Sequence, residues 1–130
     1  MTATALQVRS LVPTLTVNDL QRSLKFYRDG LGFTVSEEMK DGDKLMGVML
    51  QAGEFTVGLA QDDFAKGRDR VKGVGTRLYL ETDHDLAGLA RQLKSAGFTT
   101  GEGPAPLPWG PTGFTVTDPD GFKMTFTTPS

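Results

Sequence analysis

The sequence contains an internal repeat, and this repeat limits the folds open to the chain more than any other feature. Gly32-Phe33-Thr34 recurs as Gly97-Phe98-Thr99 at an offset of 65 residues, and Asp19-Leu20 recurs as Asp85-Leu86 at an offset of 66. Self-similarity at a fixed period indicates a duplicated structural unit. A chain of 130 residues has room for one domain with one core, so we expect both units within a single domain, 1–130.

The first unit shows the pattern of one strand, one helix and three further strands. Residues 11–17 alternate as a strand does, with Leu11, Pro13, Leu15 and Val17 on one face. A helix capped by Asn18 or Asp19 follows, and two glycines end it. Its apolar stripe consists of Leu20, Leu24, Tyr27 and Leu31. The remaining predicted strands are 33–39, 45–51 and 54–60, separated by the turn at 40–44 and by Gly53.

The second unit repeats this order after a charged, glycine-bearing connector at 61–75, which we interpret as a linker or mobile loop. A strand at 76–82 precedes a helix whose stripe is Leu86, Leu89, Leu93 and Ala96. We expect a strand at 98–103, then an irregular Pro-rich stretch at 103–111. Two strands, 113–118 and 122–128, flank an Asp-Pro-Asp-Gly turn at 118–121.

These patterns predict an α+β fold of two tandem βαβββ modules, at 8–60 and 76–128, joined by the connector. A single sheet of this kind leaves one face uncovered. We therefore expect the modules to form a curved mixed sheet around a cavity, with the helices outside. Such a cavity is typical of a binding architecture, although the repeat alone does not name what binds.

Composition excludes several kinds of site. The chain has no cysteine, so disulfides, thiolate chemistry and Cys-ligated metals are excluded, and its one histidine, His84, excludes a multi-histidine site within one chain. A net charge of −2 argues against a nucleic-acid partner. The first residues show no signal-peptide pattern and no apolar run is long enough to span a membrane, so we expect a cytoplasmic protein without a membrane partner.

Two segments carry a family resemblance. VNDLQRSLKFYRDGLGF at 17–33, with its Phe-Tyr pair, and DPDGFKMTF at 118–126 resemble the vicinal oxygen chelate superfamily. That superfamily contains glyoxalases, bleomycin resistance proteins and extradiol dioxygenases. The resemblance extends from about Leu11 to Phe126, and it implies the same duplicated βαβββ fold.

The resemblance also implies where a metal would bind in metal-dependent members, which use His, Gln or Glu at four strand positions. Carried over to this chain, the first-strand positions fall on Val12 and Arg77 and the last-strand positions on Thr125 and on Val57 or Gly58. Valine offers no donor atom, and a guanidinium is a permanent cation that repels a divalent ion. We therefore predict no metal and no cofactor.

Strand alternation predicts which side chains line the cavity. If Leu78 and Leu80 pack under the helices, then Arg77, Tyr79 and Glu81 point the other way. By the same argument, packing of Met124 and Phe126 leaves Lys123 and Thr125 for the cavity. Arg77 and Glu81 are either ligand contacts or a partly exposed ion pair along one strand.

Three further side chains are candidates for the cavity wall. Trp109, the only tryptophan, is either a platform on which a planar ligand stacks or a plug over the core. Phe55 and Met49 are either core or pocket wall. We interpret His84 as a helix-capping or plainly exposed residue, and the two aspartates at 118 and 120 as ordinary turn residues.

From the resemblance we expect a metal-free binding protein of the bleomycin-resistance kind, which sequesters a hydrophobic or planar aromatic small molecule as a homodimer. The net charge of −2 slightly favours a neutral or cationic ligand. Three alternatives stay open: a metal-dependent glyoxalase- or dioxygenase-like enzyme with a non-standard site, a metal-free enzyme that uses Tyr79, Glu81 or Arg77, and an interaction module with a filled cavity.

Overall fold

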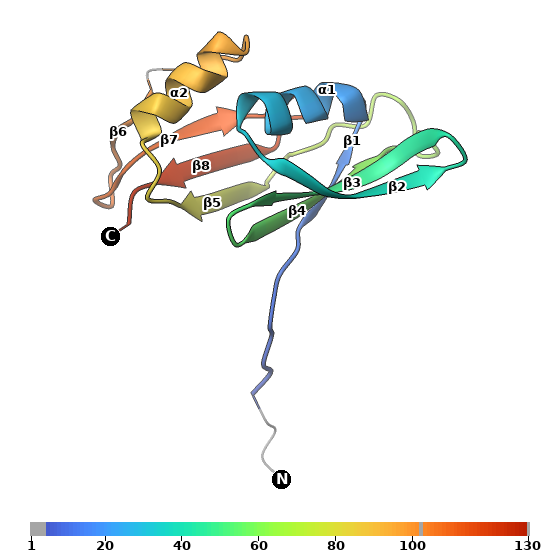
Figure 1. Cartoon of the computed structure of the whole chain (residues 1–130), viewed down its shortest axis with the longest axis horizontal. Coiled ribbons are helices and arrows are strands. Elements are labelled where there is room, and N and C mark those ends of the chain that lie inside the picture. The colour runs from blue at the N-terminus through green and yellow to red at the C-terminus, as the bar shows by residue number, and fades with distance from the viewer. Residues whose placement is uncertain (1–4, 102, 130) are drawn as a thin grey trace.

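The chain folds into two similar modules, each with one four-stranded sheet and one helical segment, shown in Figure 1. The structure is a computed structural model and describes residues 5–101 and 103–129. The first module comprises β1 (Thr14–Val17), α1 (Leu20–Leu24), η1 (Lys25–Gly30), β2 (Thr34–Asp41), β3 (Lys44–Ala52) and β4 (Phe55–Gln61). The second comprises β5 (Arg77–Glu81), α2 (Leu86–Ser95), β6 (Ala105–Pro106), β7 (Thr112–Thr117) and β8 (Lys123–Thr127).

The two sheets have the same topology. Their strand orders are β1-β4-β3-β2 and β5-β8-β7-β6. In each sheet the first strand runs parallel to the fourth, and the other pairs are antiparallel. The α+β class and the tandem βαβββ modules are therefore confirmed. Within the described residues no strand of one sheet pairs with a strand of the other, so the molecule has two sheets and no closed barrel.

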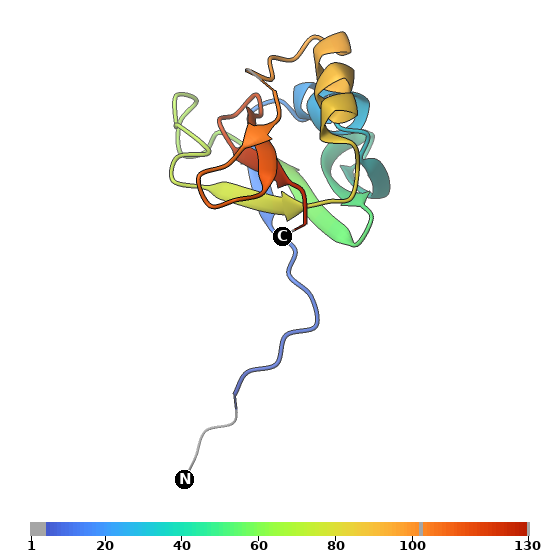
Figure 2. The ribbon, with the colours of Figure 1, turned by 90° about the vertical axis from the view of Figure 1, so that its left-hand side faces the viewer.

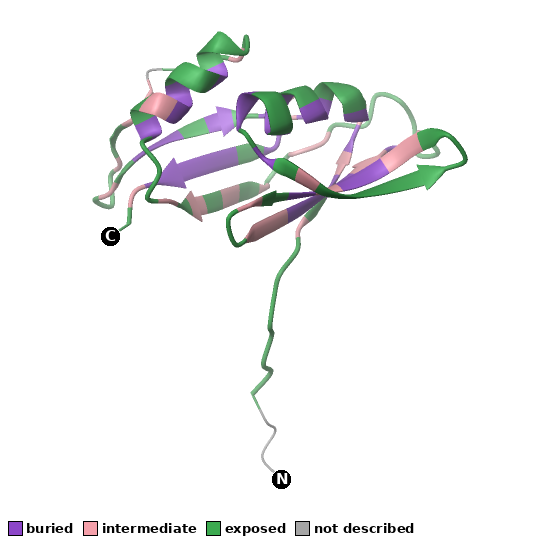
Figure 3. Cartoon of the chain, in the orientation of Figure 1, coloured by how far each residue is buried: buried purple, intermediate pink, exposed green. Residues whose placement is uncertain are grey.

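One hydrophobic core runs through both modules, and Figure 3 shows its buried residues in purple. Alternate residues of the inner strands face the helices, and Leu50, Val57 and Met124 are fully buried there. The predicted stripes of both helices are buried except at Ala96, which is exposed because α2 ends at Ser95. Within the described part of the chain, no helix has the length and apolarity needed to cross a membrane.

Helix α1 continues as a π-helix, η1, and this widened turn allows two adjacent aromatic residues to be buried. The Leu31 amide donates to the Phe26 carbonyl at 2.9 Å, five residues back. Phe26 and Tyr27 are 1% and 0% exposed. Phe26 packs edge-on against Phe98 of the second module, with ring centroids 5.0 Å apart. The segment therefore packs on both modules at once.

The first strand is shorter than the sequence pattern predicts. β1 begins at Thr14, and Leu11 is 83% exposed. Pro13 has no amide to donate, and the chain before it leaves the sheet as an extended arm, residues 5–12, visible in Figures 1 and 2. The predicted strand at 11–13 is therefore wrong, whereas Leu15 and Val17 are buried as expected.

The predicted strand at 98–103 is also wrong. Phe98 packs into the core edge instead, and Gly101 and Gly103 have φ angles of 61° and 81°, which a strand does not allow. Glu102 lies outside the described residues. The short strand β6 falls in the Pro-rich stretch expected to be irregular, where Pro106 occupies a sheet edge and pairs with Thr112.

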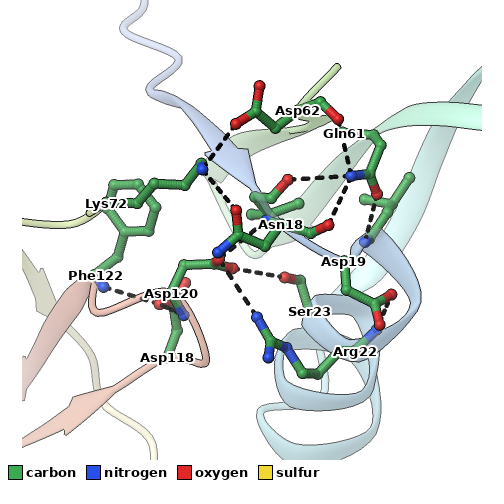
Figure 4. A network of polar contacts seen from close by, with 12 residues as sticks. Asn18, Asp19, Arg22, Ser23, Gln61, Asp62, Lys72, Asp118, Asp120 and Phe122 are labelled. Carbon is green, nitrogen blue, oxygen red and sulfur yellow. Dashed lines mark hydrogen bonds and ion pairs between the residues drawn. The ribbon is translucent and has the colours of Figure 1, made fainter. Parts of the chain in front are cut away.

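The connector at 61–75 is bound to the body of the protein at several points and is not a free linker. The Lys72 ammonium lies 2.8 Å from an Asp62 carboxylate oxygen and donates to Asn18 Oδ1 at 2.6 Å, as Figure 4 shows. The side chains of Lys72 and Asp62 are only 4% and 6% exposed. Gly73 crosses the Asp-Pro-Asp-Gly turn so closely that a Cβ there would overlap the Gly121 backbone.

The Asp-Pro-Asp-Gly turn does more than reverse the chain between β7 and β8. Asp118 accepts hydrogen bonds from the amides of Asp120 and Phe122, at 2.9 and 2.8 Å, as turn chemistry predicts. Its other carboxylate oxygen accepts from the Tyr27 hydroxyl of the first module at 2.6 Å. A turn of the second module thus binds the helix of the first.

Asp120 makes the second bond between the modules, at the start of α1. It accepts from the Asn18 amide at 3.0 Å and from the Ser23 hydroxyl at 3.3 Å (Figure 4). A carboxylate at a helix N-terminus is favourable because the amides there have no partner in the helix. Sequence reasoning treated Asp118 and Asp120 as turn residues only, since nothing local indicates that their carboxylates reach the other module.

These contacts change the ionisation of three groups. Burial raises the pKa of the Tyr27 hydroxyl far above its usual range, and the Asp118 charge adds to the effect. Burial also raises the pKa of Asp118, although hydrogen bonds from Tyr27 and two amides oppose the rise. The hydrogen bond from Lys72 and the Phe64 amide lower the pKa of Asp62 to about 2 from 3.8. Asp62 therefore stabilises the fold above about pH 4, and that stabilisation disappears as the pH falls towards 2.

The two tyrosines provide a matched test of the bond between modules. Tyr27→Phe should reduce the free energy of unfolding by about 1–3 kcal/mol, because it leaves a buried Asp118 oxygen without its donor. Tyr79→Phe, in which an exposed tyrosine loses its hydroxyl, should change it by less than about 0.5 kcal/mol. Urea unfolding followed by circular dichroism measures both. Equal losses in the two variants would contradict a structural role for the Tyr27–Asp118 bond.

Candidate functional site

The face of the second sheet that points away from α2 is the candidate site, and we call it the outer face. Its parallel register places Arg77 beside Lys123, Tyr79 beside Thr125, and Glu81 beside Thr127. Leu78 and Leu80 pack against the core on the opposite face, as the predicted alternation requires. Five of the eight predicted cavity residues thus lie on one face: Arg77, Tyr79, Glu81, Lys123 and Thr125.

A hollow of about 420 Å³ opens on this face, lined by Tyr79, Glu81, Trp109, Pro111 and Thr127. The rings of Tyr79 and Trp109 meet edge to face, with centroids 5.9 Å apart and planes at 78°. These side chains are 58% and 57% exposed. Trp109 is therefore not a plug over the core, and its ring is open to a ligand.

Thr125 forms the floor of the outer face. Its side chain is 1% exposed, and its hydroxyl lies 2.7 Å from the Thr115 hydroxyl on the neighbouring strand. Because β8 is an inner strand of the sheet, Thr125 has a neighbour on each side, Tyr79 on β5 and Thr115 on β7. Thr125 was expected to contact a ligand, but in this structure its hydroxyl is hydrogen-bonded to that of Thr115. The residue lies beside Tyr79 in the sheet.

The charged groups of the outer face have no ion-pair partners within residues 5–101 and 103–129. Arg77, Lys123 and Glu81 are all exposed, and none takes part in a salt bridge. One Arg77 nitrogen lies 3.5 Å from the Tyr79 hydroxyl. The alternative in which Arg77 and Glu81 pair along the strand is therefore wrong.

A second, larger recess lies between the modules, as an open groove of about 920 Å³. It shares Tyr79 and Glu81 with the hollow, and Phe55 and the end of the β3–β4 turn form its opposite wall. Phe55 packs mainly on the core side, with its ring 6.1 Å from that of Phe33. His84 is exposed at the groove's edge, and its amide donates to the Thr82 hydroxyl at 3.0 Å.

Met49 is separated from the other candidates. It lies on the corresponding face of the first sheet, where its register partner on β4 is Gly58, and it lines neither the hollow nor the groove. A Cβ at Gly58 would come within 3.1 Å of the Met49 sulfur and of the Thr14 hydroxyl.

The family described as Glyoxalase/Bleomycin resistance protein/Dioxygenase superfamily matches residues 9–126. The chain belongs to this superfamily. A search of curated proteins found no significant match.

Solved structures of other superfamily-like proteins share the fold over nearly the whole chain. An integron cassette protein from the mobile metagenome of V. cholerae is 25% identical, with a TM-score of 0.71 over 98% of this chain and 100% of that one. A cassette protein from V. pseudocholerae is 26% identical, with a TM-score of 0.70 over 98% and 99%. A glyoxalase/bleomycin resistance protein/dioxygenase from Nocardioides is 16% identical, with a TM-score of 0.72 over 96% and 85%, and shows the fold alone.

The positions that the superfamily resemblance assigns to metal ligands do not fit a divalent cation here. Val12 lies before β1, Val57 is buried in the core, and Arg77 carries its own positive charge. Arg77 and Thr125 are not register partners either, since Arg77 pairs with Lys123. No group of three or more His, Cys, Asp or Glu side chains converges among the residues that the structure describes.

Proposed function

We propose that the protein binds a planar, hydrophobic small molecule on the outer face of its second module, without a metal and without breaking a bond. The observation that carries this proposal is the exposed Tyr79–Trp109 pair in a hollow of about 420 Å³. Large aromatic rings are normally buried, so two that remain more than half exposed and in contact indicate a binding surface. Membership of a superfamily that includes bleomycin resistance proteins supports sequestration as the mode of action.

The donor chemistry favours binding over the enzymatic alternative. A glyoxalase- or dioxygenase-like reaction needs a metal, and the inherited positions hold valine, arginine and threonine. A metal-free enzyme built on Tyr79, Glu81 or Arg77 would need an acid or base held in a site that excludes water. Arg77 and Glu81 lie instead on an open, solvent-exposed face.

The cytoplasmic location remains a prediction.

Trp109→Ala tests the site. The neutral planar dye N-phenyl-1-naphthylamine should bind the wild type, and the variant should bind it more than tenfold more weakly, because the stacking surface is lost. The melting temperature should stay within a few degrees, since Trp109 is 57% exposed. Phe64→Ala on the connector is the matched control and should bind the dye normally. Unchanged affinity in Trp109→Ala would contradict the proposed function.

The same titrations, repeated with EDTA, separate the metal-free proposal from the enzymatic one. Neither the affinity for the dye nor the melting temperature of protein purified without chelator should change. Stoichiometric zinc, nickel, manganese or iron, lost together with stability on adding EDTA, would overturn the metal-free proposal.

We also propose that the protein is a homodimer in which the N-terminal arm packs on the second copy. The arm leaves the body as an extended segment (Figure 2), and Leu6, Val8 and Leu11 are 85%, 68% and 83% exposed. An extended apolar segment of this kind gains stability when a partner covers it. No other copy is needed to form the hollow itself.

Light scattering after size exclusion tests the dimer. The full chain should have the mass of two copies, and a variant lacking residues 1–11 should have the mass of one, because the arm supplies the apolar contact. A second variant, the full chain with Leu6→Ser and Leu11→Ser, should also shift the measured mass towards that of one copy. A full chain that stays monomeric at high concentration would refute the dimer, and a dimer that survives the deletion would refute the role of the arm.

A further inference from the structure

The charges around the hollow indicate how a bound ligand would be oriented. Arg77 and Lys123 are register partners on adjacent parallel strands, and both side chains are exposed on the outer face. Like charges placed opposite each other in a sheet repel and destabilise the pair. Neither forms a salt bridge within the described residues. Within residues 5–101 and 103–129, two adjacent cations thus have no acidic partner to balance them.

Arg77 lies next to the aromatic pair, and Lys123 lies beside Arg77 on the neighbouring strand. One Arg77 nitrogen is 3.5 Å from the Tyr79 hydroxyl, so the guanidinium reaches the edge of the ring that lines the hollow. A guanidinium presents a planar fork of donors that matches the oxygens of a carboxylate, sulfonate or phosphate. A ring packed against Tyr79 and Trp109 would thus have its substituent within reach of Arg77.

The opposite end of the hollow carries the opposite charge. Glu81 lines it directly, four residues along the same strand from Arg77, which is about 13 Å between backbones. Asp83 continues the acidic end beyond the strand, beside the groove. A ligand with a negative group is repelled at this end and attracted at the other, so the two ends together fix its direction.

From this arrangement we infer that the ligand class is a planar aromatic monoanion. Its ring lies against Tyr79 and Trp109, and its anionic group faces Arg77 and Lys123. The inference rests on the proposed function, since it concerns the same hollow. It reverses the preference for a neutral or cationic ligand that the net charge of −2 favoured. Local charges a few ångströms away outweigh a small net charge that salt screens over about 8 Å.

A pair of dyes that differ by one sulfonate tests the inference. 8-Anilinonaphthalene-1-sulfonate is the anionic counterpart of N-phenyl-1-naphthylamine, and thioflavin T serves as a planar cation. The wild type should bind the sulfonate at least fivefold more tightly than the neutral dye, and added NaCl should reduce that preference. Energy transfer from Trp109, the only tryptophan, reports that each naphthalene dye sits near the hollow.

Variants that each remove one charge test which residues cause the preference for the sulfonate dye. Arg77→Gln and Lys123→Gln should each weaken binding of the sulfonate dye about fivefold and leave the neutral dye unchanged. Glu81→Gln should strengthen binding of the sulfonate dye. Arg91→Gln, on α2 at the other side of the sheet, is the matched control and should change neither dye.

The outcomes separate this inference from the proposed function. Equal affinity for the sulfonate and neutral dyes, or tighter binding of thioflavin T, would overturn the anionic class. If Trp109→Ala still weakens that binding, the aromatic site is retained. Binding that does not depend on Trp109 would overturn the site itself. A sulfonate preference that persists in Arg77→Gln and in Lys123→Gln would overturn the assignment of these two residues.

Discussion

The buried carboxylates of Asp118 and Asp120 hold the two modules in one arrangement. They belong to a turn of the second module, yet they accept hydrogen bonds from Tyr27, Asn18 and Ser23 of the first. A buried carboxylate is costly unless donors surround it, so these bonds are available in only one relative position of the modules. The Lys72–Asp62 pair fixes the connector beside them. Apolar packing alone would tolerate more than one orientation.

This fixed arrangement explains why the outer face of the second sheet is free. The turn binds α1 and η1 on the helical side of the sheets, so the core forms there and the opposite faces receive no cover from the chain's own helices. On the first sheet, Gly58 lies opposite Met49, and a Cβ at Gly58 would come within 3.1 Å of the Met49 sulfur and of the Thr14 hydroxyl. On the second, Trp109 stands over Tyr79 and leaves a hollow. Two modules of one topology have thus acquired different outer surfaces.

The sequence predicts the features that depend on repeating patterns. The duplicated strand order, the buried stripe from Leu20 to Leu31, and the side of the sheet on which Arg77, Tyr79 and Glu81 lie all follow from periodicity. A strand or helix pattern repeats over many residues, and tertiary contacts reinforce it.

Features set by single long-range contacts could not be predicted in this way. Residues 98–101 form no strand because Phe98 packs against Phe26, and Thr125 is occupied because it bonds to Thr115. The carboxylates at 118 and 120 look like those of any Asp-Pro-Asp-Gly turn until Tyr27 and Asn18 are placed beside them. That Arg77 has no ion-pair partner among the described residues is likewise visible only in three dimensions.

The central claim is that ligands bind on the outer face of the second sheet and not in the groove between modules. Amide and indole chemical shifts during a titration with 8-anilinonaphthalene-1-sulfonate test it most directly. The account predicts that the largest changes occur at the Trp109 indole N–H and along residues 77–81 and 123–127. Changes centred instead on Gly53 and Gln92, which line the groove and not the hollow, would contradict it.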